Sequence, residues 1–121
     1  MARTLTLTGQ VDMKRDSAQE DTIQQKLADQ SITHYSRQNV TLATNTSNQD
    51  VPFPTGLTTA TFGMVVSSGS TMTYSADSTS THHKLADGGL AVWNGNFTSL
   101  CLSNNSTAAG DSNTPTVIIA G

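Results

Sequence analysis

The stretch TTATFGMVVSSGSTMTYSA, residues 58–76, decides the fold class of this sequence. From Thr58 to Ser67 apolar residues recur at every second position before an apolar run, which is the pattern of a β-strand. The serines and glycine of Ser67 to Ser70 predict a turn, and Thr71 to Ser75 begins another short strand. A strand, a tight turn and a second strand in so short a segment are typical of an all-β protein.

Three other segments mix apolar and β-branched residues with polar ones in the same way: Thr4 to Val11, Ser31 to Thr44 and Thr114 to Ala120. Each is predicted to be β-structure. Residues Asn45 to Asp50 predict a turn, because the side chains of Asn, Ser and Asp can bond to the nearby backbone. These segments extend the β pattern over most of the chain.

The sequence around Asn94-Gly95-Asn96 predicts a β-hairpin. An Asn-Gly pair favours the two-residue turns that join antiparallel strands. We therefore expect Leu90 to Trp93 to pair with Phe97 to Leu102.

One segment, Ser17 to Ile32, has helical features. Ser17 and Glu20 have the spacing of a capping box, and Ile23 and Leu27 would share one helix face. Because this apolar stripe is thin, we expect at most one short helix near residues 17–30.

About seven or eight short strands separated by turns predict a β-sandwich or barrel. A jelly roll is favoured, and Greek-key or immunoglobulin-like sandwiches are close alternatives. The 121 residues are expected to form a single domain, residues 1–121, in which residues 1–37 are a more charged part available for docking.

The composition argues against several classes of partner. Only 12% of the residues are charged and the net charge is −3, so no basic surface for nucleic acid is expected. No segment has the roughly 18 apolar residues of a membrane span, and the N-terminus does not resemble a secretory signal.

The lone Cys101 lies between two leucines and is predicted to be a small buried apolar residue.

No set of residues predicts catalysis, a metal site or a cofactor. His82 and His83 are adjacent, so in a strand they would point to opposite faces and could not readily bind one ion. Glu20 and Asp21 fit a helix start better than a carboxylate pair. We therefore expect a protein that is not an enzyme and holds no cofactor.

Several segments between Val51 and the C-terminus, taken together, resemble small β-rich virion proteins of tailed bacteriophages, including capsid decoration or cement proteins. This resemblance is one of strands and turns in order, without a diagnostic motif. The segments are Val51 to Gly56, Thr61 to Ser67, Gly88-Gly89, Trp93-Asn94-Gly95, Leu100 to Asn104 and Val117 to Gly121.

The resemblance implies a decoration protein on the outer capsid surface, made in the cytoplasm of a bacterial host. Such a protein is commonly a homotrimer, and its partners would be itself and a major capsid or other virion protein. A tail, fibre or baseplate component is the structural alternative. A carbohydrate-binding module for host attachment, with Trp93 stacking on a sugar ring, is the alternative from another class.

Two surfaces are predicted to make the protein contacts. Five of the six cations fall between Arg3 and Arg37, so this segment is expected to supply much of the docking surface. The segment from Val51 to Pro54 is expected at an edge or in an extended connection, because its prolines cannot donate to a β-ladder. The predicted interface residues are Arg3, Leu5, Lys14, Arg15, Pro52, Phe53 and Pro54.

Overall fold

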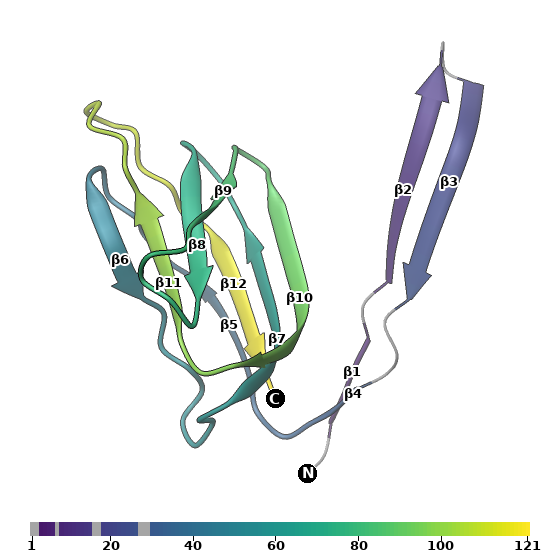
Figure 1. Ribbon diagram of the computed structural model, residues 1–121, viewed down its shortest axis with the longest axis horizontal. Coiled ribbons are helices and arrows are strands. Elements are labelled where there is room, and N and C mark those ends of the chain that lie inside the picture. The colour runs from purple at the N-terminus through teal and green to yellow at the C-terminus, as the bar shows by residue number, and fades with distance from the viewer. Residues whose placement is uncertain (1–2, 7, 16–17, 27–29) are drawn as a thin grey trace. The chain divides into compact units, whose positions relative to one another are not determined.

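The structure is a computed structural model that describes residues 3–6, 8–15, 18–26 and 30–121 (Figure 1). The chain divides into two compact units, Met1–Thr33 and His34–Gly121. This boundary falls inside the charged part predicted over residues 1–37, and the single domain over residues 1–121 stays a prediction. In the part of the chain described, no helix has the length and apolar character needed to cross a membrane.

The first unit consists of two antiparallel strand pairs. β1 (Arg3–Leu5) pairs with β4 (Gln30–Ile32), and β2 (Thr8–Arg15) pairs with β3 (Ala18–Lys26). The first predicted strand is thus divided between β1 and β2, and residue 7 lies outside the described residues.

The expectation of at most one short helix near residues 17–30 holds, since the described part of this segment contains no helix and Ala18–Lys26 is strand β3. Ser17 and residues 27–29 lie outside the described residues. A helix here would have had only a thin apolar stripe to bury, whereas a strand gains backbone hydrogen bonds to β2 along its length. The register also sets Val11 opposite Ile23, two β-branched residues that favour strands.

The second unit is a β-sandwich of two four-stranded antiparallel sheets, with strand orders β10-β7-β12-β5 and β6-β11-β8-β9. The prediction of an all-β sandwich is confirmed. Its strands are β5 (Tyr35–Asn39), β6 (Thr46–Asp50), β7 (Ala60–Val66), β8 (Met72–Ala76), β9 (His83–Leu85), β10 (Leu90–Phe97), β11 (Leu100–Asn104) and β12 (Thr116–Ala120).

The strand pairing of this unit is nested. β5 pairs with β12, β6 with β11, β7 with β10 and β8 with β9. This unit is therefore a long antiparallel ribbon, rolled so that β12 also pairs with β7 and β11 also pairs with β8. An eight-stranded double sheet with this nesting is a jelly roll, the version that the sequence favoured.

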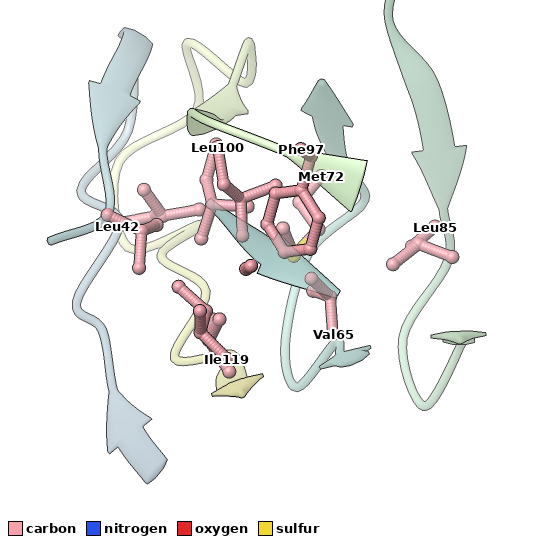
Figure 2. Close-up of a cluster of buried hydrophobic side chains, with 11 residues drawn as sticks. Leu42, Val65, Met72, Leu85, Phe97, Leu100 and Ile119 are labelled. Atoms are coloured by element: carbon pink, nitrogen blue, oxygen red, sulfur yellow. The ribbon is translucent and has the colours of Figure 1, made fainter. Parts of the chain in front are cut away.

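Apolar side chains from both sheets fill the space between them, as Figure 2 shows. Because successive side chains of a strand point to opposite faces, Leu100 and Leu102 of β11 enter this core while Cys101 between them does not. The core residues are Leu42, Val51, Ala60, Val65, Met72, Leu85, Phe97, Leu100, Leu102, Val117 and Ile119.

A cluster of aromatic side chains packs against this core beside Gly63 of β7. The Trp93 ring stacks on Tyr74, with ring centroids 5.5 Å apart and an interplanar angle of 8°. Trp93 also contacts Phe97, at a centroid distance of 5.2 Å. Gly63 is the cross-strand partner of Trp93, and a Cβ atom at Gly63 would lie 2.2 Å from Trp93 Cζ2. Only glycine leaves room for the indole ring here.

The predicted hairpin between Leu90–Trp93 and Phe97–Leu102 is wrong. β10 continues through Asn94-Gly95-Asn96 to Phe97 and pairs with β7, whereas β11 lies in the other sheet. The step from Asn94 to Phe97 matches the shorter step from Phe62 to Ala60 on β7, so the Asn-Gly segment forms a β-bulge. Phe97 belongs to the core cluster and Trp93 packs against it, so the packing of this continuous strand outweighs the local turn preference.

The predicted turn over Asn45–Asp50 is also wrong for most of its length. The turn occupies residues 44–45, and β6 begins at Thr46. Asn45 and Asn48 have positive φ angles of 56° and 48°, which asparagine tolerates well. The asparagines thus shape the turn and an irregularity in an edge strand.

Candidate functional site

Four surface features of the described chain bear on function: the β2–β3 hairpin, an apolar sheet face and two pockets. The hairpin belongs to the first unit and the others belong to the jelly roll.

The N-terminal residues predicted for docking lie on two strand pairs. Arg3 and Leu5 are in β1, opposite Ile32 and Gln30, and the side chain of Arg3 is exposed. The basic pair Lys14-Arg15 ends β2, where the hairpin leads into β3. The structure therefore separates this basic pair from Arg3, and their role at an interface stays a prediction.

The β2–β3 hairpin has two open edges. Among the described residues, β2 pairs only with β3 and β3 only with β2. Each strand therefore keeps one row of backbone N–H and C=O groups without a strand partner. An isolated two-stranded ribbon is at best marginally stable in water, and its open edges are templates for pairing with another chain.

The outer face of the β10-β7-β12-β5 sheet carries apolar side chains. Val92, Met64 and Ile118 lie in register across three adjacent strands and are half-buried. At the two edge strands, the side chains of Leu90 and Tyr35 are 58% and 41% exposed. This face differs from the hydroxyl-rich surface elsewhere on the jelly roll.

The segment Val51–Pro54 connects β6 to β7, as the prediction of an extended connection proposed. Val51 is buried in the core, and Phe53 packs edge-on against Phe97 at a centroid distance of 5.4 Å. Pro52 is exposed, and its carbonyl oxygen accepts a hydrogen bond from Gln38 Nε2 at 2.7 Å. Phe53 is thus partly used inside the fold, and the interface role of Pro52, Phe53 and Pro54 stays a prediction.

Phe53 also lines an open pocket of about 420 Å³. Apolar side chains form one part of its wall and hydroxyl groups another, and its single charged residue is Asp50. We call it the Phe53 pocket, and its lining residues are Asp50, Val51, Phe53, Leu57, Thr58, Thr98, Ser99 and Leu100.

Asp77 fixes the Thr98–Ser99 side of this pocket, at the crossing between the two sheets. Its Oδ1 accepts hydrogen bonds from Thr98 N at 2.7 Å, Thr98 Oγ1 at 3.0 Å and Ser99 N at 3.2 Å. The hydrogen bond from the Thr98 backbone is the main cause that lowers the pKa of Asp77 below its usual value, against a smaller opposing effect of burial. The carboxylate therefore stabilises this crossing.

We expect Asp77→Ala to lower the free energy of unfolding at pH 7 by about 1 kcal/mol, a modest value because the site is open to solvent. Asp77→Asn keeps an acceptor and tolerates the φ angle of 56°, so it should cost less. Because folding lowers the pKa of Asp77, its charge stabilises the fold above about pH 4, and this contribution is lost as the pH falls through the folded pKa. Urea unfolding from pH 7 to pH 2 should show the wild-type and Asp77→Asn stabilities converging in acid. A pH-independent difference would contradict this.

A second pocket, of about 390 Å³, lies on the outer side of β8 and β9. We call it the Lys84 pocket. Lys84 is the only lysine or arginine after Arg37. The lining residues are Ser70, Thr71, Met72, Thr73, Lys84, Asn105, Ser106 and Asp111.

Buried Asn104 holds the loop that forms one wall of the Lys84 pocket. Its Nδ2 donates to the carbonyl oxygens of Asp111 at 2.7 Å and Leu42 at 3.3 Å, and its Oδ1 accepts from Ser106 N at 3.1 Å. Ser106 Oγ in turn donates to Asp111 Oδ2 at 2.9 Å. The polar groups of this wall are thus positioned before any ligand binds.

Two polar side chains that line the Lys84 pocket, Thr73 and Lys84, make no side-chain hydrogen bond to the described chain. Thr73 is 7% exposed, and its buried Oγ1 has no hydrogen-bond partner among the described residues. Thr73 and Lys84 are cross-strand partners on β8 and β9, so their side chains share one face of the sheet. No hydrogen bond or ion pair within the described chain engages the Lys84 ammonium group.

His83 and Cys101, which were considered from the sequence as reactive or metal-binding residues, are packed against other side chains of the fold. His83 lies 5.2 Å from the Tyr74 ring, and no group of three or more His, Cys, Asp or Glu that could hold a metal occurs in the described part of the chain. Cys101 is buried, as predicted, with Sγ 3.5 Å from Asp50 Oδ1. Burial and the neighbouring Asp50 raise the pKa of the Cys101 thiol, which favours the unreactive protonated form.

Comparisons with family models, curated proteins and solved structures found no match. The candidate sites therefore depend on the geometry alone. Sequence reasoning missed the Lys84 pocket, whose one visible signal was a lone cation in a long, nearly uncharged segment.

Proposed function

We propose that this protein is a structural component of a bacteriophage particle, one that decorates the capsid and stabilises it through protein–protein contacts. The observation that carries the proposal is the β2–β3 hairpin with its two open edges. Such a ribbon gains most by pairing with, or packing on, a neighbouring chain. In a capsid, that contact adds free energy that only the assembled shell can receive.

The distribution of charge supports different roles for the two units, with docking assigned to the first. Nine of the fifteen charged residues lie in residues 1–33, although these form the smaller unit. The jelly roll keeps its polar surface mainly through Ser, Thr and Asn. We assign specific docking to the charged hairpin, since charge pairs set orientation and exclude wrong partners.

The jelly roll also supports the proposal, because one of its faces is suited to contacts between copies of the protein. The apolar outer face of β10-β7-β12-β5 has exposed Leu90 at one edge and Tyr35 at the other. Contiguous exposed apolar patches are among the features that mark protein–protein contact sites. The homotrimer remains part of the proposal.

Removal of the whole hairpin should abolish capsid binding and leave the jelly roll folded. We would replace residues 8–26 by a short Gly-Ser linker, since removing β2 alone would leave β3 without its partner. The variant should fall to background occupancy on particles purified from the phage that encodes the chain. Occupancy is measured by quantitative gel analysis of the particles after sedimentation.

The control for this deletion is the paired variant Lys14→Gln/Arg15→Gln, which keeps both strands and removes two charges. It should bind with a reduced association rate and a weaker dependence on salt. The near-ultraviolet circular dichroism and Tm of both variants report whether the jelly roll is intact. Full occupancy of the deletion variant with an intact jelly roll would rule out the proposed docking role.

A further inference from the structure

We propose that the Lys84 pocket binds a sugar that bears a carboxylate, such as a uronic acid residue. This inference does not depend on the proposed capsid function, because every lining residue belongs to the jelly roll. The volume of about 390 Å³ falls in the range of small-ligand sites, about 300–1,000 Å³.

The pocket holds one charge of each sign, Lys84 and Asp111, and so suits a ligand with one anionic group and several hydroxyl groups. The Lys84 ammonium group can donate to a carboxylate, and such charge-assisted hydrogen bonds are about twice as strong as neutral ones. Asp111 lines the same pocket and would repel a doubly charged phosphate more strongly than a singly charged carboxylate. Its carboxylate can instead accept hydrogen bonds from ligand hydroxyl groups.

The neutral groups of the pocket favour a polyhydroxylated ligand. Thr71 and Thr73 carry hydroxyl groups without a hydrogen bond to the described chain, and Asn105 supplies an amide. The Ser70 and Ser106 hydroxyls donate to Asp111 and keep their capacity to accept. Hydroxyl groups both donate and accept, so they match the alternating donors and acceptors around a sugar ring. Only one large apolar residue, Met72, is among the lining residues, and it is 1% exposed.

The Thr73 hydroxyl is the polar group at this pocket whose hydrogen-bonding capacity is unused within the described chain. A buried hydroxyl without a partner destabilises a fold, so such groups are rare unless a ligand or water completes them. Thr73 is a lining residue of the pocket, on the same sheet face as Lys84, and its Oγ1 is covered from solvent. A turn of the Thr73 side chain toward the pocket would let a sugar hydroxyl complete its hydrogen bonding.

The direct test titrates the full-length chain with D-glucuronate and follows the backbone amides by NMR. We expect a Kd on the order of 1 mM, as suits an open pocket with few contacts. Shifts should concentrate at residues 70–73, 84 and 105–111. D-glucose, which lacks the carboxylate, should bind about tenfold more weakly, and so should D-glucuronate to the Lys84→Met variant.

Thr73→Val separates a binding role from a structural one. Valine has the shape of threonine without the hydroxyl, so the variant should raise the Tm of the free protein by roughly 4 °C while lowering glucuronate affinity severalfold. Thr116→Val is the matched control on the opposite sheet, where the hydroxyl donates to Asn39 Oδ1 at 3.0 Å. The control should lose a little stability and bind glucuronate normally.

Three outcomes would overturn the inference. The first is the absence of localised shifts at 50 mM glucuronate, roughly fifty times the expected Kd. The second is equal binding of glucose and glucuronate, and the third is unchanged affinity in both Lys84→Met and Thr73→Val. The reduced affinity of Lys84→Met, together with higher stability and lower affinity in Thr73→Val, would support it.

Discussion

Gly63→Ala is expected to lower the free energy of unfolding by about 3 kcal/mol, at the upper end of the usual cost of overpacking a core. The added methyl group would lie 2.2 Å from Trp93 Cζ2 and 2.4 Å from Cε2. The indole ring cannot move away easily, because Tyr74 stacks on it and Phe97 contacts it. Urea unfolding followed by Trp93 fluorescence would measure the loss.

Gly95→Ala is the matched control for this prediction. Gly95 lies on the same strand pair, and a Cβ atom there would have no neighbour within 4 Å. Its effect should stay within about 0.5 kcal/mol. The double variant Gly63→Ala/Trp93→Leu should lose less stability than the two single losses added together, since the clash requires the ring. A Gly63→Ala variant as stable as Gly95→Ala would contradict the packing described.

Asn113→Ala is expected to cost about 3 kcal/mol, because it leaves one buried and two partly buried polar groups without partners. Asn113 is 1% exposed. Its Nδ2 donates to Ser67 Oγ at 3.0 Å and to the Ser70 carbonyl oxygen, and its Oδ1 accepts from Ser68 N at 3.1 Å. These bonds join the loop before β12 to the loop after β7.

Two further variants test whether the amide group itself is responsible. Asn105→Ala, an exposed position, should change stability by less than about 0.5 kcal/mol. Asn113→Asp keeps the acceptor but buries a charge, so its penalty should be large at pH 7 and should shrink in acid as the carboxyl group becomes protonated. Chemical unfolding at pH 7 and pH 4 would measure these differences in the free energy of unfolding. If Asn113→Ala lowered the free energy of unfolding no more than Asn105→Ala does, the assigned hydrogen-bond network would be refuted.

The sequence predicts well those strands whose apolar residues face the core. The strand predicted over Thr58–Ser67 is β7, and the one over Thr114–Ala120 is β12, because burial of one face imposes a period of two. The jelly roll could be favoured only by analogy, since strand number does not determine pairing. The pairing depends on contacts such as Val117 with Val65, which are far apart in the sequence.

Strands without an apolar pattern could not be predicted. β6 (Thr46–Asp50) has no apolar residue and is an edge strand held by its pairing with β11. β3 has only Ala18 and Ile23 as apolar residues, and its capping-box spacing suggested a helix. In both cases the partner strand, and not the local sequence, determines the conformation.

The candidate sites, like these strands, depend on contacts between distant segments that the local sequence does not reveal. The cations near the N-terminus indicated a charged docking segment, but not that Lys14 and Arg15 end a strand of a free-edged hairpin. The Lys84 pocket combines three separate segments, around residues 70–73, 84 and 105–111. Only the nested pairing of the jelly roll brings them together.

The most direct test of the account compares hydrogen exchange of the free chain with that of the chain bound to its particle. We predict that the amides of β2 and β3 exchange within seconds in the free chain and become strongly protected on the particle, while those of β7, β11 and β12 are protected in both states. Hairpin amides that exchange equally fast in both states, with the protein fully bound, would contradict the claim that the hairpin is the docking element.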